Sequence, residues 1–193
     1  MPNDRVKNLR TETLSDNWYT LKKVTYDYLK NDGTWQRQSR EAYDRGNGAV
    51  ILLYNKEKGT VILTRQFRVP TYINGNPTGM LIEACAGLLD QASPEERIKK
   101  ETEEETGYRI SSVQKIFEAY TSPGSVTEIL DFFVAEYSDR MKVSAGGGVE
   151  HEQEEIEVME LTVEEALSMV KQGEIKDAKT IMLLYHCQLH CIM

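Results

Sequence analysis

The 193-residue chain lacks several features that would place it in a specialised class of protein. No apolar run approaches the roughly 18 residues of a membrane span, and the opening residues MPNDRVKNLR contain no apolar stretch typical of a signal peptide. The three cysteines are an odd number without regular spacing, so a disulfide framework is not expected. We therefore expect a protein of a reducing, cytoplasmic compartment that does not insert into membranes.

Positive charge is also scarce. Lys and Arg number 23 against 31 Asp and Glu, which gives a formal net charge of −8. This balance argues against general binding to nucleic acid or to an acidic membrane surface, although metal cations can still bring phosphates to an acidic protein. Hydrophobic residues make up 40% of the chain, which is enough for one core and leaves room for a small appendage.

The N-terminal residues show the alternation of a β-hairpin. WYTLKKVTYDYLK (18–30) and TWQRQSREAYDR (34–45) alternate in polarity, and the turn signal NDG lies between them. A continuous apolar run, AVILLY, follows and is typical of a buried strand. We predict an N-terminal β-hairpin unit over residues 1–45 and a second domain over residues 46–193.

The second domain mixes strands with few helices. The segments TVILTRQFR, MLIEACAG, SVQKIFEAY, EILDFFVAEY and IEVMEL are typical of strands, whereas YINGNPTG contains too much Gly, Asn and Pro for regular structure. Ser93, Thr162 and Asp177 are each suited to begin a helix, and Gly107 and Gly173 end the first two. This order favours an α+β fold or an α/β sandwich.

The helix predicted over residues 94–106 carries an unusual charge run. Four of five consecutive residues in it are acidic: Glu101, Glu103, Glu104 and Glu105. One interpretation is a solvated helix with i,i+4 pairs Arg97–Glu101, Lys99–Glu103 and Lys100–Glu104. In each pair, however, the cation is on the N-terminal side, and the glutamates crowd the negative end of the helix dipole.

A second interpretation gives this acidic run a function. Glu101, Glu104 and Glu105 stand at i, i+3 and i+4 and therefore share one helix face, whereas Glu103 points elsewhere. Converging carboxylates repel one another unless a cation lies among them, and hard oxygen ligands suit Mg²⁺ or Mn²⁺. The helix also has only one large aliphatic residue, Ile98. We favour the metal-binding interpretation.

The C-terminal YHCQLHC offers another pattern with metal-ligand spacing, because His186 and His190, and Cys187 and Cys191, lie at i,i+4. Nothing nearby in the sequence supplies the remaining ligands of a metal site. A helix that packs some of these side chains inward explains the pattern better, and we expect no metal there.

Residues 86–108, AGLLDQASPEERIKKETEEETGY, resemble the Nudix box, G-x5-E-x7-R-E-U-x-E-E-x-G-U with U aliphatic or aromatic. The first half departs from it, since Gly87 is one residue closer to Glu101 and the early glutamate is missing. LSDNWYTL, REAYDRGNGAVILLYN, SPGSVTE and GEIKDAKT are similar to the nucleoside-diphosphate-sugar branch of the Nudix hydrolase family. In the second half of the box Lys100 takes the arginine position, followed by Glu101, Thr102, Glu104, Glu105, Gly107 and Tyr108.

The resemblance implies an α/β/α sandwich with a mixed sheet, an N-terminal antiparallel β unit and a homodimer. It implies hydrolysis of the diphosphate bond of a nucleotide sugar with Mg²⁺, or Mn²⁺ as a substitute. GDP-mannose, split into GMP and mannose 1-phosphate, is the expected substrate, and ADP-ribose or another nucleotide sugar is the alternative. An inactive nucleotide-sugar-binding module is an alternative of another class, against which the retained glutamates of the box argue.

The resemblance also implies individual roles. Metal is assigned to Glu101, Glu105 and the backbone carbonyl of Ala86, with Glu104 close at hand. A further ligand or base is implied in the loop VEHEQEEIEV, where alignment from the glycines selects Glu152 and alignment back from Ile156 selects Glu154; the alternative is a merely solvated acidic loop. Catalytic candidates are thus Glu104, Glu105, Glu152 and Glu154.

The implied substrate contacts are spread along the chain. Arginine suits diphosphate oxygens and tryptophan suits a planar base. The alternative to substrate contact is packing within the hairpin for Trp18, and for Arg40 it is a surface charge that binds nothing. The full set is Trp18, Ser39, Arg40, Glu41, Arg68, Ala86, Gly87, Glu128 and Lys179.

Overall fold

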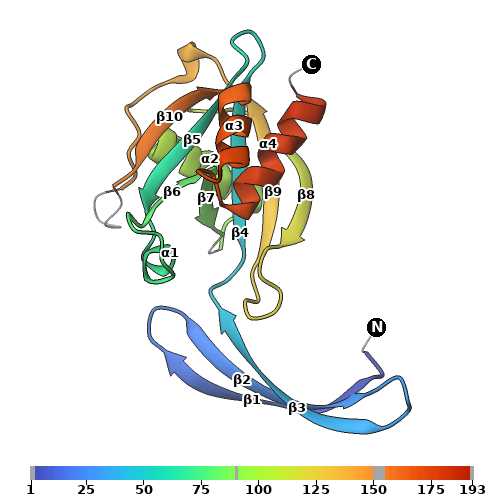
Figure 1. Ribbon diagram of the computed structural model, residues 1–193. Coiled ribbons are helices and arrows are strands. Elements are labelled where there is room, and N and C mark those ends of the chain that lie inside the picture. Colours follow the sequence, from blue (N-terminus) through green and yellow to red (C-terminus); the bar gives the residue numbers. More distant parts are fainter. Residues whose placement is uncertain (1–2, 90, 150–154, 192–193) are drawn as a thin grey trace. The chain divides into compact units, whose positions relative to one another are not determined.

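The computed structural model (Figure 1) describes residues 3–89, 91–149 and 155–191. The chain divides into two compact units, one of residues 1–47 and 120–129 and the other of residues 48–119 and 130–193. Residues 120–129 belong with the N-terminal strands because backbone bonds join them: Tyr43 N donates to Ser125 O at 2.7 Å, and Thr127 N donates to Tyr43 O at 3.0 Å. No sequence pattern predicts that the chain returns to these strands.

The first unit is an antiparallel sheet in the order β1-β2-β3. The predicted hairpin is confirmed as β2 (Thr20–Leu29) and β3 (Trp35–Asp44). Strand β1 (Val6–Asp16) was missed, because apolar residues are sparse in VKNLRTETLSD and do not alternate. The pairing of β1 with β2 is also irregular between Lys7 and Arg10, where Asn8 has a φ of 56°.

The second unit contains a mixed sheet in the order β10-β5-β4-β9-β8, to which β6 adds beside β5 and β7 beside β4. Strands β4 and β9 are parallel, and β4 pairs antiparallel with both β5 and β7. The bounds are β4 (Gly48–Asn55), β5 (Thr60–Phe67), β6 (Met80–Glu83), β7 (Cys85–Leu88), β8 (Gln114–Tyr120), β9 (Ile129–Glu136) and β10 (Glu157–Thr162).

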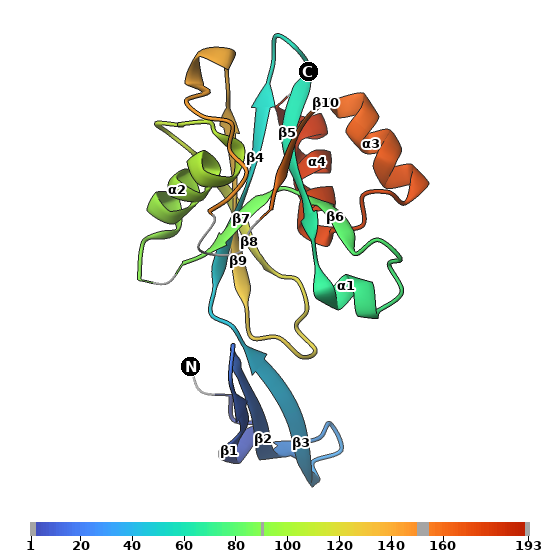
Figure 2. The same ribbon diagram turned by 90° about the vertical axis from the view of Figure 1, so that its left-hand side faces the viewer.

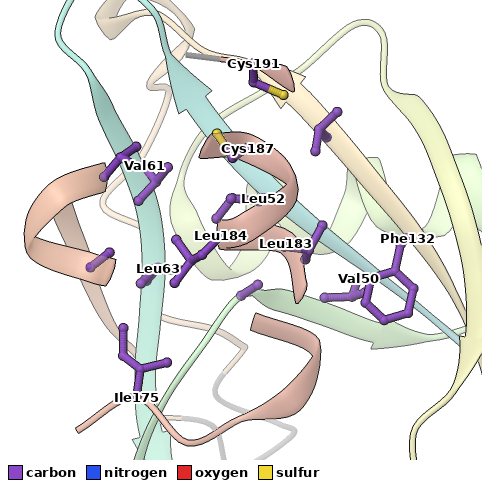
Figure 3. Packing of buried hydrophobic residues seen from close by; sticks show 14 of the residues in the cluster. Val50, Leu52, Val61, Leu63, Phe132, Ile175, Leu183, Leu184, Cys187 and Cys191 are labelled. Carbon is purple, nitrogen blue, oxygen red and sulfur yellow. The ribbon is translucent and has the colours of Figure 1, made fainter. Parts of the chain in front are cut away.

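Helices cover both faces of this sheet, α2 on one side and α3 with α4 on the other (Figure 2). Strand β4 is continuous and apolar because it contributes to both cores: Val50 and Leu52 pack toward α4, as Figure 3 shows, and Ile51 packs toward Ile98 of α2. The predicted α/β/α sandwich is confirmed. The bounds are α1 (Val69–Ile73), α2 (Pro94–Thr106), the 3₁₀ turn η1 (Asp139–Met141), α3 (Val163–Gln172) and α4 (Ala178–His190).

Two local predictions were wrong. MLIEACAG is not one strand, because the chain breaks between β6 and β7 at Ala84, whose N–H donates to Thr180 Oγ1 of α4 at 2.7 Å. YINGNPTG is not wholly irregular, because Tyr72 and Ile73 complete the short helix α1, which Pro70 helps to start.

The prediction that a C-terminal helix packs some of the side chains of YHCQLHC inward is confirmed, since Cys187 and Cys191 are buried in the core, as Figure 3 shows. None of the helices in the described parts of the chain is long and apolar enough to cross a membrane.

Candidate active site

Helix α2 is well terminated at both ends. Ser93 and Glu96 form the predicted capping box, Pro94 occupies the first turn, and Gly107 closes the helix with a φ of 79°. Between these ends, the buried positions are mostly polar, since they include Glu101, Thr102, Glu105 and Thr106 beside Ile98. A helix normally buries an apolar stripe, so this buried face indicates a function other than packing.

Glu101 and Glu105 are the two buried carboxylates of α2, with 6% and 2% of their surface exposed. Glu101 forms an ion pair with Arg97 and lies so close to Gly87 of β7 that a Cβ at Gly87 would overlap the carboxylate. The absence of a side chain at Gly87 is therefore what admits Glu101 to the surface of β7, next to Ala86. The structure thus brings Glu101 against the residue that follows Ala86.

Glu105 lies beside the thiol of Cys85. Burial, and then the charge of Glu105, raise the pKa of the Cys85 thiol well above its ordinary value. The thiol therefore keeps its proton and remains a neutral neighbour of the carboxylate.

The remaining acids of the helix are less buried. Glu104 pairs with Lys100 at 3.0 Å, as predicted, and Arg97 pairs with Glu101, also as predicted. The predicted pair Lys99–Glu103 is wrong, because Lys99 pairs with Glu95 at 2.6 Å. Glu103 instead accepts two hydrogen bonds from Arg109, at 2.7 Å each.

A second charged cluster surrounds Glu83, the last residue of β6. Arg68 Nε donates to Glu83 Oε2 at 2.6 Å, and Lys179 Nζ donates to Glu83 Oε1 at 2.6 Å. Lys179 also pairs with Asp177, the N-cap of α4, at 2.8 Å. Two predicted substrate contacts, Arg68 and Lys179, are thus held together by one buried carboxylate that is 4% exposed.

The charges in this cluster stabilise one another. Burial alone would raise the pKa of Glu83, but Lys179 and Arg68 outweigh it and hold that pKa below its ordinary value. Burial would lower the pKa of Lys179, but Glu83 and Asp177 raise it. The pKa of Arg68 is likewise raised, by Glu83 against the effect of burial, with a smaller contribution from Glu105. Arg68 is thereby linked electrostatically to the acidic face of α2.

The donor set fits a hard divalent cation. Glu101 and Glu105 offer carboxylate oxygens and β7 offers backbone carbonyls, while Arg68 and Lys179 supply positive charge suited to phosphate oxygens. Within residues 3–89, 91–149 and 155–191, however, no three Asp, Glu, His or Cys side chains converge as a complete metal site. The sequence candidates Glu152 and Glu154 lie outside the described residues.

The other predicted substrate contacts belong to the first unit. Trp18 is 84% exposed in the turn before β2, so packing within the hairpin does not explain it. Arg40 and Glu41 are exposed on β3. On the same strand, Ser39 Oγ lies 3.3 Å from Thr25 Oγ1 of β2. Glu128 is buried and faces Arg45 at 3.4 Å.

Sequence reasoning missed Glu83 and Cys85 as neighbours of the site. A signal for Glu83 was present, since it is the only acid in MLIEACAG, and an acid inside a buried strand needs a cationic partner. Cys85 gave no comparable signal, because a buried cysteine is an ordinary core residue.

Comparison with known proteins identifies the family. The family model described as the NUDIX domain matches residues 44–184, which include the whole of α2 and the cluster around Glu83. The chain belongs to the Nudix family. The model described as the GDP-mannose pyrophosphatase NudK N-terminal domain matches residues 5–43.

Curated members of the Nudix family match over nearly the full length. "GDP-mannose pyrophosphatase" of Yersinia enterocolitica is 58% identical over 189 residues, 98% of each chain. The protein of that name from Cronobacter sakazakii is 56% identical over 188 residues, 97% of each chain. A solved structure titled "Crystal structure of ADP compounds hydrolase" superposes with a TM-score of 0.71 at 16% identity, covering 98% of this chain and 95% of that chain, which shows likeness of fold alone.

Proposed function

We propose that this Nudix pyrophosphatase hydrolyses the diphosphate bond of GDP-mannose to GMP and mannose 1-phosphate. The observation that carries the proposal is the buried pair Glu101 and Glu105 of α2, which occupies the face where an apolar stripe would otherwise pack and of which Glu101 lies against Gly87. The choice of substrate is supported by relatives of 56–58% identity that bear the name GDP-mannose pyrophosphatase.

Mg²⁺, with Mn²⁺ as a substitute, is the metal of this proposal. Glu101, Glu105 and the carbonyl of Ala86 would hold it, with Glu104 nearby and a further carboxylate from Glu152 or Glu154. When bound, such an ion neutralises diphosphate charge, polarises the phosphoryl oxygens and lowers the pKa of water.

The chain's own residues bind and orient the diphosphate. Because Arg68 donates to Glu83 through Nε, the guanidinium is fixed in direction, and its terminal nitrogens are proposed to bind phosphate oxygens. Lys179, held between Glu83 and Asp177, adds a point charge. Ala86 and Gly87 are proposed to contact the substrate through their backbone, on the side of Gly87 that Glu101 does not occupy.

The hydrolysis itself needs a base and a leaving group. A carboxylate among Glu104, Glu105, Glu152 and Glu154 accepts a proton from the attacking water. The water oxygen forms a bond to one phosphorus, and the bridging P–O bond breaks with its electron pair remaining on the departing phosphate.

We propose that residues of the first unit also contact substrate. The exposed ring of Trp18 is available to stack on a base, and Ser39, Arg40, Glu41 and Glu128 supply polar contacts. We also propose a cytoplasmic homodimer. The exposed apolar side chains Leu9, Leu14 and Trp35 on the first unit support association, and two-fold symmetry is the commonest arrangement. Sedimentation at the mass of one chain would contradict the dimer.

A substrate panel tests the proposal. GDP-mannose, ADP-ribose and a diadenosine polyphosphate are supplied at equal concentration with Mg²⁺, and phosphomonoester products are converted by a phosphatase to inorganic phosphate for measurement. GDP-mannose should give the highest kcat/KM. A higher value for ADP-ribose would reassign the substrate, and no turnover of any of them would indicate a binding module.

A further inference from the structure

Three consecutive glycines, Gly146–Gly148, lie against the C-terminal end of α2. Gly147 N donates to the carbonyl of Glu105 at 2.9 Å, and Gly148 N donates to the carbonyl of Glu104 at 3.1 Å. The last carbonyls of a helix have no partner within the helix. Here the carbonyls that need one belong to two of the glutamates proposed for the active site, and a segment some forty positions further along the chain provides the donors.

At Gly146 the glycine segment fits α2 so closely that a side chain is excluded. Gly146 has a φ of 71°, and a Cβ on it would lie 2.5 Å from the carbonyl oxygen of Glu105 and 2.6 Å from the carbonyl carbon of Thr106. Gly147 and Gly148 have φ values of 111° and 85°. Residues other than glycine rarely adopt such conformations.

The same segment is anchored on its other side. The carbonyl of Gly147 accepts a hydrogen bond from Ile156 N at 3.1 Å, and Ile156 is 8% exposed. Gly107 accepts from Val143 N at 2.8 Å. The end of α2 is therefore fixed by hydrogen bonds from Val143 and from the glycine segment. Through Gly147 it is also linked to Ile156, the residue before β10.

Helix α3 shows that a helix of this fold can end without such help. Gly173 N donates to the carbonyl of Val170, and the N–H groups of Glu174 and Ile175 donate to that of Met169. All these partners are local, as in an ordinary glycine cap. The distant glycine segment at α2 is therefore more than helix termination requires.

We propose that Gly146, Gly147 and Gly148 are positioning residues of the active site, which fix the backbone of Glu104 and Glu105 and thereby the direction of their carboxylates toward a divalent metal. The inference depends on the metal site of the proposed function. It assigns to the glycines no contact with substrate or metal.

Direct binding of Mn²⁺ to the metal-free protein, measured by calorimetry, tests the inference without using activity. Gly146→Ala should weaken Mn²⁺ binding about 10- to 100-fold, as is typical when the support of a metal ligand is lost. The matched control is Gly173→Ala, at a helix end with a φ of 75° where a Cβ would meet only Lys176 Cε at 3.7 Å. It should lower the unfolding temperature but bind Mn²⁺ as the wild type does.

The outcomes separate the inference from the proposed function. Equal Mn²⁺ affinity of the wild type and both variants overturns the inference and leaves the metal site standing. No binding of Mn²⁺ by the wild type overturns both. A wild type that binds Mn²⁺ and hydrolyses no nucleotide sugar overturns the function alone.

A second measurement covers the case in which Gly146→Ala does not fold. This measurement uses Mg²⁺ in place of Mn²⁺, because Mg²⁺ is diamagnetic. Hydrogen exchange at the amides of Gly147 and Gly148 in the wild type should be slower in the Mg²⁺-saturated protein than in the metal-free protein. Unchanged exchange at both amides, in a protein whose unfolding temperature Mg²⁺ raises, would overturn the inference.

Discussion

Helices α2 and α3 begin and end alike but bury different side chains. Each starts with a capping box, at Ser93 and Thr162, and each ends at a glycine with positive φ, Gly107 and Gly173. Their termini therefore follow the same local rules, and a difference in their roles has to come from the faces between the ends.

Those faces differ in kind. Helix α3 buries Val163, Ala166 and Leu167, whereas α2 buries Glu101 and Glu105 with Ile98 as its one large aliphatic residue. Burial of apolar surface stabilises a fold, whereas burial of carboxylates costs free energy unless partners or ions compensate. The comparison teaches that α3 contributes to stability, whereas α2 sacrifices stability, as the proposed metal site would require.

The largest expected effect is the loss of activity on Glu105→Gln. We expect kcat/KM to fall about 1,000-fold, or about 4 kcal/mol, because a metal ligand or base is removed. Glu103→Gln on the same helix is the control, since this acid pairs with Arg109 at the surface and its loss should change kcat/KM by the equivalent of less than about 1 kcal/mol. Steady-state kinetics with GDP-mannose measures both, and full activity of Glu105→Gln would remove the functional difference between the helices.

The next effect is on stability and concerns α3. Leu167→Ala should lower the free energy of unfolding by about 2–4 kcal/mol, because it leaves a cavity in the core beneath the helix. Urea titration measures this loss, with exposed Glu164→Ala as the control. Activity of the folded variant at 25 °C should match that of the wild type, and a parallel fall in kcat/KM would show that α3 also serves the site.

The shared helix starts should respond equally. Ser93→Ala and Thr162→Ala should each reduce the free energy of unfolding by about 1 kcal/mol, since each removes an N-cap acceptor. Neither should change Mn²⁺ affinity. If Ser93→Ala weakened Mn²⁺ binding and Thr162→Ala did not, the two termini would not be equivalent.

The smallest effect is a pH dependence common to both caps. The hydroxyl of Ser93 holds the pKa of Glu96 below its ordinary value of 4.5, and Thr162 does the same for Glu165. A lowered folded-state pKa gives stabilisation that is present above pH 4.5 and is lost as the pH falls through the folded value. Glu96→Gln and Glu165→Gln should each flatten the acid side of the stability profile, and an unchanged profile would contradict the cap geometry.

Much of this comparison could be predicted from sequence. Capping boxes and C-terminal glycines are local patterns, so the termini of α2 and α3 follow from Ser93, Glu96, Gly107 and their counterparts. The alternation in β2 and β3 and the apolar run of β4 were equally direct. The spacing of Glu101 and Glu105 also placed both acids on one face.

What could not be predicted depends on contacts between distant residues. Thr180 determines the break at Ala84, and Glu83 aligns Arg68 with Lys179. Arg109 is the partner of Glu103. None of these pairs has a fixed spacing in sequence. Strand β1 was missed for another reason, since its exposed residues show no alternation and only pairing with β2 makes it a strand.

Thermal unfolding with and without Mg²⁺ tests most directly whether α2 is a metal-binding helix. At a Mg²⁺ concentration 100 times its Kd, the wild type should gain about 2.7 kcal/mol of stability. The same Mg²⁺ should leave Glu105→Gln nearly unchanged. Without Mg²⁺, the variant should unfold at a higher temperature than the wild type, because one buried charge is gone. Equal stabilisation of both proteins by Mg²⁺, or of neither, would contradict the account.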